Sequence, residues 1–146
     1  MTSTPLAGSR IKAANTPDPY ILSAPATSST AISGTPATDL TGATITFTTA
    51  QPNASVLVTG VFDAQTTATG AVGVGTCVVD GATQSGQATW GLTTLNARGT
   101  VTQVWNVTLA TAGSHTIKLQ GALSSASGTV TYGTTHTNIN LLVMDW

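Results

Sequence analysis

Apolar and polar residues alternate over short stretches of this chain from Ala43 onward, and this alternation constrains the fold more than any other feature. In "ATITFTT" (43–49) the pattern places Ile45 and Phe47 on one face of an extended segment. β-Branched threonines lie between them and favour a strand. The longest alternating run, "GTVTQVWNVTLA" (99–110), directs four apolar side chains the same way: Val101, Trp105, Val107 and Leu109. No long segment has helical periodicity, so the sequence predicts strands.

Turns rich in Gly, Pro, Asn, Asp and Ser separate about eight predicted strands, a spacing typical of an all-β sandwich. One turn is Asp80-Gly81, a dipeptide that suits a two-residue type I′ hairpin. Mixed hairpin and longer connections favour an antiparallel jelly roll, and a chain of 146 residues suits one domain. The strand predicted at 55–63 is apolar on both faces, with Val58 on one and Leu57 on the other. We therefore expect it to be covered on both sides.

Charged side chains are scarce, at 6% of the chain against about 25% in an ordinary soluble domain. Glutamate is absent, and the net charge is −1. Binding to nucleic acid needs several lysines or arginines on one face, so this composition argues against it. No apolar run reaches the ~18 residues of a membrane-spanning helix. A net charge near zero favours association, which predicts a subunit whose surface is covered by neighbours.

The sequence offers little for catalysis or for binding a cofactor. The ionisable residues near predicted strand ends are His115, His136, Asp63 and Asp80, and no nucleophile motif accompanies them. The two histidines lack the short spacing and the Cys or Glu partners of a metal site. The single cysteine, Cys77, excludes an internal disulfide and is expected to be a small buried residue. We predict no enzyme activity, no cofactor and no metal.

The first 38 residues differ in composition from the rest. They are rich in Ser, Thr, Ala and Pro, as in an extended linker, with one short strand predicted at Thr30–Ser33. They also lack the apolar core of a secretory signal. Such a segment becomes ordered only when a partner surface holds it. The sequence therefore predicts a docking arm and linker at 1–38 and a β jelly-roll domain at 39–146. The predicted docking residues are Arg10, Ile11, Lys12 and Tyr20.

Two further groups of residues are candidates for surface contacts. In the last predicted strand, Leu142 and Met144 lie on the outer row, and Trp146 follows them. We predict that these three residues form an oligomer interface, with simple intramolecular packing as the alternative. Trp90 and Tyr132 are the candidates for an exposed aromatic platform that binds sugars.

Several stretches resemble virion proteins. The stretch "AGSRIKAAN" (7–15) resembles an opening motif of small tail-associated proteins of actinobacterial phages, in which Ala-Gly precedes a basic residue and an I-x-A-A step. Two stretches of the body, "VWNVTLATAGSHTIKLQGALSSASGTV" (104–130) and "NINLLVMD" (138–145), are similar to the jelly-roll head domains of phage fibre, minor tail and capsid-decoration proteins. The layout is also similar to the trimeric necrosis-factor/C1q-like fold.

The resemblance implies a non-enzymatic structural protein on the virion surface of a tailed phage, assembled in the host cytoplasm. It would serve as a capsid decoration or head fibre, or as a minor tail component. The implied partners are further copies of the chain in a homotrimer and the major capsid or tail proteins. If the protein is a tail component, the resemblance implies a host cell-surface glycan as a further partner. The alternative is a stand-alone carbohydrate-binding or adhesion module, which predicts a monomer with an exposed aromatic platform.

Overall fold

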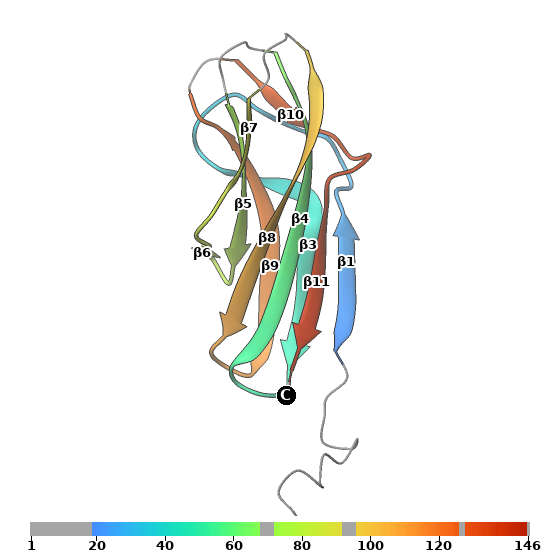
Figure 1. Ribbon diagram of the computed structural model, residues 1–146, viewed down its shortest axis with the longest axis vertical. Helices are drawn as coiled ribbons and strands as arrows, with labels where there is room; N and C mark the ends of the chain where they lie inside the picture. The colour runs from blue at the N-terminus through green and yellow to red at the C-terminus, as the bar shows by residue number, and fades with distance from the viewer. Residues whose placement is uncertain (1–18, 68–71, 92–95, 126–127, 146) are drawn as a thin grey trace, which may run out of the picture.

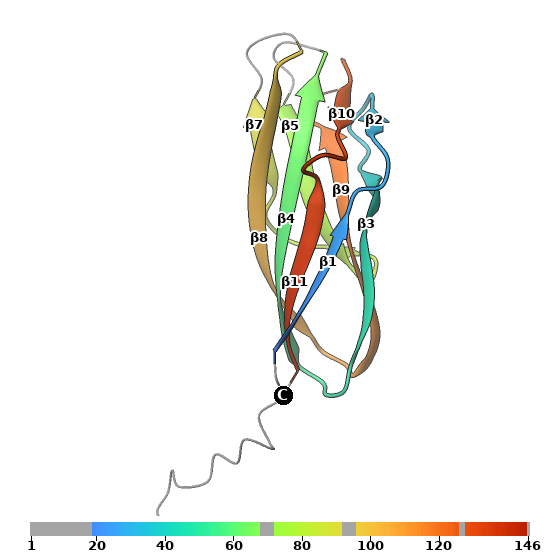
Figure 2. The same cartoon turned by 90° about the vertical axis from the view of Figure 1, so that its right-hand side faces the viewer.

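The structure is a computed structural model that describes residues 19–67, 72–91, 96–125 and 128–145. Two antiparallel sheets pack face to face, as Figures 1 and 2 show. The six-stranded sheet contains β1 (Tyr20–Pro25), β2 (Thr30–Ile32), β4 (Ala54–Thr66), β8 (Arg98–Leu109), β10 (Val130–Tyr132) and β11 (Asn138–Met144). The five-stranded sheet contains β3 (Thr38–Thr49), β5 (Val72–Val79), β6 (Ala82–Thr83), β7 (Ala88–Gly91) and β9 (Gly113–Leu123). The predicted all-β antiparallel sandwich is confirmed.

Strand β4 is the centre of the six-stranded sheet. One edge of β4 pairs with the whole of β8, from Ala54 opposite Leu109 to Gln65 opposite Arg98. The other edge pairs first with β11 and then with β10. Strands β1 and β2 extend the sheet beyond β11 and β10. This arrangement explains why β4 and β8, at 13 and 12 residues, are the longest strands of the sheet.

Strand β9 lies between β3 and β5 in the other sheet. The far edge of β5 pairs with β7 and then with β6, which follows it through the turn Asp80-Gly81. The φ angles of these two residues, 48° and 85°, are both positive, as a type I′ turn requires. The predicted hairpin is therefore confirmed. Glycine takes the second position without strain because it has no Cβ.

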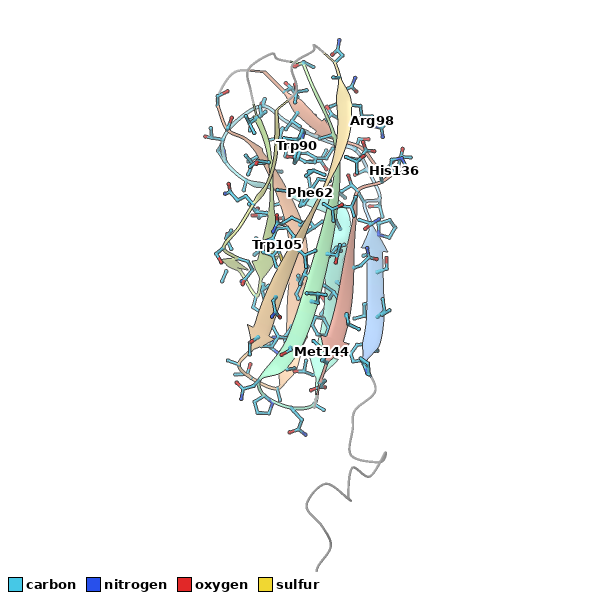
Figure 3. All side chains as sticks on the ribbon, viewed as in Figure 1. Phe62, Trp90, Arg98, Trp105, His136 and Met144 are labelled. Atoms are coloured by element: carbon cyan, nitrogen blue, oxygen red, sulfur yellow. The ribbon has the colours of Figure 1, made fainter. Side chains whose placement is uncertain are left out.

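Aromatic rings fill the space between the sheets at one end of the sandwich. The Phe62 ring lies within 6.2–6.4 Å of the rings of Trp90, Trp105 and Tyr132, measured between centroids. Figure 3 shows Phe62, Trp90 and Trp105 in the middle and upper part of the molecule. Glycine makes this packing possible, because a Cβ on Gly75 would come within 2.6 Å of the Phe62 ring. Glycine in one sheet thus leaves room for a large ring from the other sheet.

The predicted linker is wrong from Tyr20 onward, and so is the predicted boundary after residue 38. Strand β1 pairs with β11 from Tyr20 opposite Val143 to Pro25 opposite Asn138. Strand β2 confirms the short strand predicted at Thr30–Ser33, and it also belongs to the sheet, beside β10. Backbone pairing outweighs the Pro- and Ser-rich composition here, because an edge strand tolerates proline. The predicted docking residues Arg10, Ile11 and Lys12 lie outside the described residues.

Candidate functional site

The outer face of the six-stranded sheet carries an apolar row across three neighbouring strands. We call Ile21 on β1, Leu142 on β11 and Leu57 on β4 the apolar row, since the strand register places them side by side. Ile21 is 74% exposed and Leu57 is 37% exposed. The prediction that both faces of β4 are covered is therefore wrong for its outer face. Val104 on β8, 48% exposed, lies on the same face in the next row, opposite Thr59.

The side chains around the apolar row are uncharged. The neighbouring row consists of Ser23, Asn140, Thr59 and Val104, and it is polar apart from the valine. At one end of the face, Arg98 pairs with Asp63. Figure 3 shows Arg98 at the end of the sandwich away from Met144. A neighbour that covers the row would therefore bury apolar area without removing these charges from water.

The residues predicted for an oligomer interface are only partly placed by the structure. Leu142 and Met144 are half-buried and lie on the outer face of β11. Leu141 and Val143 alternate with them along the strand and point into the core. Trp146 lies outside the described residues. The sequence pattern identified β11 but missed Ile21, because that residue lay in a segment interpreted as linker. The alternation places Leu57 on the face opposite Val58, and the structure contradicts the prediction that this face is covered.

The predicted aromatic platform is wrong for Tyr132, which is 1% exposed. Its hydroxyl donates to the backbone carbonyl of Val74 at 2.6 Å, and the Ala122 carbonyl lies at 3.3 Å. Burial raises the pKa of Tyr132. Trp90 is half-buried with its ring against Gly73 and at 87° to the Tyr132 ring. Both aromatic side chains lie on the inward faces of their strands, β7 and β10. These strands are only four and three residues long, so the alternation in the sequence is too short to show which face is inward.

His115 and Asp80 form a polar cluster at the start of β9. His115 Nδ1 lies 2.7 Å from Asp80 Oδ2, and Nε2 lies 3.0 Å from the Thr111 carbonyl. Both partners are acceptors, so both ring nitrogens donate only when the imidazole is protonated. The hydrogen bond to Asp80 raises the pKa of His115. Both ring nitrogens of His115 have partners, and the residue is only 5% exposed. The cluster therefore joins two turns and does not offer a free base.

Asp63 and Arg98 form a second cluster, where the partner of β4 changes from β11 to β10. Arg98 Nε donates to Asp63 Oδ1 at 2.6 Å, and Nη2 binds the other carboxylate oxygen. The hydrogen bond from Arg98 holds the pKa of Asp63 below its usual range. The Gly133 N–H donates to the Asp63 carbonyl at 2.7 Å, and Thr137 Oγ1 accepts from the Asp63 N–H at 3.1 Å. These bonds fasten the connection between β10 and β11 to β4.

Other chemistry is sparse in the described part of the chain. Those residues contain no group of three or more His, Cys, Asp or Glu side chains that could hold a metal ion. None of them forms a helix that could span a membrane. Burial raises the pKa of the Cys77 thiol to about 12, so it is not a nucleophile at neutral pH. The apolar row and its uncharged surroundings are thus the best candidate for function.

No family model matches the sequence, and no curated protein matches it. Similarity appears among solved structures. A chain of the T13 viral particle of infectious bursal disease virus is 17% identical, with a TM-score of 0.54, over 98% of this chain and 39% of that one. Dimeric latent PorU from Porphyromonas gingivalis is 12% identical, with a TM-score of 0.55, over 93% of this chain and 14% of that one.

The Eiger TNF from S. frugiperda is 8% identical, with a TM-score of 0.52, over 84% of this chain and 91% of that one. The chain thus spans well under half of the viral and PorU chains that it matches, and most of the TNF chain. At these identities the similarity concerns the fold. The chain has the jelly-roll sandwich that viral-particle and TNF-like chains share.

Proposed function

We propose that this chain is a non-enzymatic structural protein of a tailed-phage virion that displays its jelly roll on the particle surface. It would act as a capsid decoration or head fibre, or as a minor tail component. The observation that carries the proposal is the apolar row on the outer face of the six-stranded sheet, together with its uncharged surroundings. A surface of this kind is favourable when a neighbouring subunit covers it.

The neighbour that fits this face best is a second copy of the chain, within a homotrimer. Ile21 is the most exposed member of the apolar row, and it adjoins Leu142 directly. The adjoining Ser23, Asn140 and Thr59 can hydrogen-bond across an interface, as the polar rim of a subunit contact does. Because the row is uncharged, identical copies can approach each other without charge repulsion. Copies in a closed ring would cover every such face.

Attachment to the particle is proposed for the segment before Tyr20. Figure 1 shows β1 beginning at the end of the sandwich where β11 ends, and the register places Tyr20 opposite Val143. The Tyr20 hydroxyl donates to the Thr48 carbonyl at 3.3 Å and so ties β1 to β3 of the other sheet. Tyr20 therefore fixes where a docking segment would leave the sandwich. Arg10, Ile11 and Lys12 remain its proposed contact residues.

The fold shared with a chain of a viral particle supports a virion location over the alternative. The alternative, a stand-alone carbohydrate-binding or adhesion module, predicted an exposed aromatic platform. The burial of Tyr132 and the packing of Trp90 weigh against that platform.

The mass of the chain in solution tests the assembly step. We expect light scattering to give three times the monomer mass for the parent chain. The Leu57→Lys variant should give the monomer mass, because the trimer would bury the lysine charge in the interface. Thr44→Lys is the matched control, since Thr44 is exposed on the outer face of the other sheet. A monomeric parent chain, or a Leu57→Lys chain that stays trimeric, contradicts the proposed interface.

The virion location needs a separate experiment. Immunogold labelling of purified particles should mark the head if the protein decorates the capsid and the tail if it is a tail component. Particles that carry no label and yield no peptides of this chain by mass spectrometry contradict the virion role.

A further inference from the structure

A groove of about 370 Å³ lies on the outer face of the five-stranded sheet, away from the apolar row. Strands β5 and β9 form its base. The connection between β2 and β3 forms one wall, where the Leu123 N–H donates to the Gly34 carbonyl at 3.0 Å. Residues around the connection between β6 and β7 form the other wall. Its volume is at the lower end of the ~300–1,000 Å³ typical of ligand sites, so it suits a group the size of one sugar ring.

The lining of the groove combines small apolar side chains with neutral hydrogen-bonding groups. Val74 and Ala122 are apolar and belong to the base. Thr35, Thr83 and Gln87 belong to the walls, and all three are exposed. None of the described residues that line the groove is charged. An anion or a cation would therefore lose its hydration without gaining a counter-charge.

Thr76, at the base of the groove, has an unusual environment. Its side chain is 6% exposed, and its hydroxyl oxygen is buried without a hydrogen-bond partner among the described residues. A buried hydroxyl without a partner destabilises a fold, whereas valine would have the same shape without that penalty. Rotation about χ1 moves the hydroxyl of threonine between three staggered positions, and we infer that one of these positions presents the hydroxyl to a ligand in the groove.

We propose that this groove binds a neutral sugar ring, with Thr76 and Gln87 as its hydrogen-bonding residues. The inference rests on the proposed function in one respect: a jelly roll displayed on a particle is exposed to cell-surface glycans. Val74 and Ala122 contact the C–H face of the ring, and hydroxyl and amide groups in the walls bind its hydroxyl groups. A threonine hydroxyl and a glutamine amide each donate and accept, as sugar hydroxyls do.

A fully apolar ligand fits the groove less well. It would leave the Thr76 hydroxyl without a partner and would remove the polar walls from water. Ser124 adds a further neutral group. Its Oγ accepts from the Val72 N–H at 3.0 Å, and its own proton has no acceptor among the described residues. The combination favours a ligand that is uncharged and rich in hydroxyl groups.

NMR titration of the full chain with glucose, galactose, mannose and N-acetylglucosamine, each at millimolar concentration, tests the proposal. We expect at least one sugar to shift amide signals around the groove and to leave those near the apolar row unchanged. Thr76→Val should weaken binding at least tenfold and raise the Tm. Gln87→Ala, at an exposed position, should weaken binding with little change in Tm. The matched control Thr44→Val, outside the groove on the same sheet, should bind like the parent chain.

Two outcomes overturn the proposal: no sugar of the panel shifts the groove signals, or binding is unaffected by both Thr76→Val and Gln87→Ala. Neither outcome depends on subunit assembly or on a virion location. A trimeric, particle-bound chain that binds no sugar would refute the groove alone. A sugar-binding chain that is absent from particles would refute the virion role alone.

Discussion

The Tyr132 hydroxyl donates a 2.6 Å hydrogen bond to the Val74 carbonyl and so joins β10 of one sheet to β5 of the other. Its ring lies in the core between the sheets, over the backbone of Gly121. This residue connects the two halves of the sandwich through both packing and hydrogen bonding.

The Tyr132→Phe variant should lose about 1–2 kcal/mol of unfolding free energy, because the Val74 carbonyl loses its bond from the hydroxyl while the ring still fills its space. Urea denaturation measures this change. Tyr20→Phe is the control, since its hydroxyl makes a longer bond of 3.3 Å in an exposed setting, and it should lose less. Equal losses in the two variants would show that the Tyr132 hydroxyl does not join the sheets.

Gly121→Ala should destabilise the fold by about 1–3 kcal/mol or more, because the added methyl would overlap the Tyr132 ring and force the sheets apart. Gly91→Ala is the matched control, since a Cβ there meets nothing within 4 Å. Thermal unfolding of the two variants compares them directly. If Gly121→Ala unfolds at the same temperature as the control, the result contradicts the close packing of β9 against the Tyr132 ring.

The His115 cluster should make stability depend on pH. The folded pKa of His115 is raised above its ordinary 6.5 by the hydrogen bond to Asp80. The stabilisation is therefore fully present below about pH 6.5, the unfolded value, and is lost as the pH rises through the folded pKa. Urea unfolding between pH 6 and pH 9 should show this decline.

The Asp80→Asn variant provides the test of that mechanism, because it removes the carboxylate that stabilises the imidazolium. Its unfolding free energy should change less over the same pH range. A decline that is as steep in Asp80→Asn as in the parent chain would assign the pH dependence to another group.

Cys77 should resist alkylation in the native chain. Its thiol is fully buried, and its pKa of about 12 leaves almost no thiolate at pH 8. Iodoacetamide followed by mass spectrometry should label the chain in urea but not in buffer. Rapid labelling of the native chain would mean that β5 opens readily.

Much of the local structure follows from the sequence alone. The alternation around Ile45 and Phe47 and along β8 predicts strands and their inward faces, because the side-chain period of two depends only on the backbone. The Asp80-Gly81 turn is equally local, since its type depends on the φ angles that two adjacent residues can adopt. The scarcity of charge likewise predicts a surface suited to association before any fold is known.

The tertiary structure decided which strands are neighbours, and the functional surfaces depend on that. Ile21 joins Leu142 and Leu57 only because β1 pairs with β11 and β11 with β4. Tyr132 is buried because β10 packs over Gly121, and Thr76 is at the base of a groove because the connection between β2 and β3 crosses the sheet. These contacts join residues distant in the chain, so their energies depend on packing and backbone pairing across the whole sandwich. A local pattern of apolar and polar residues carries no information on that pairing.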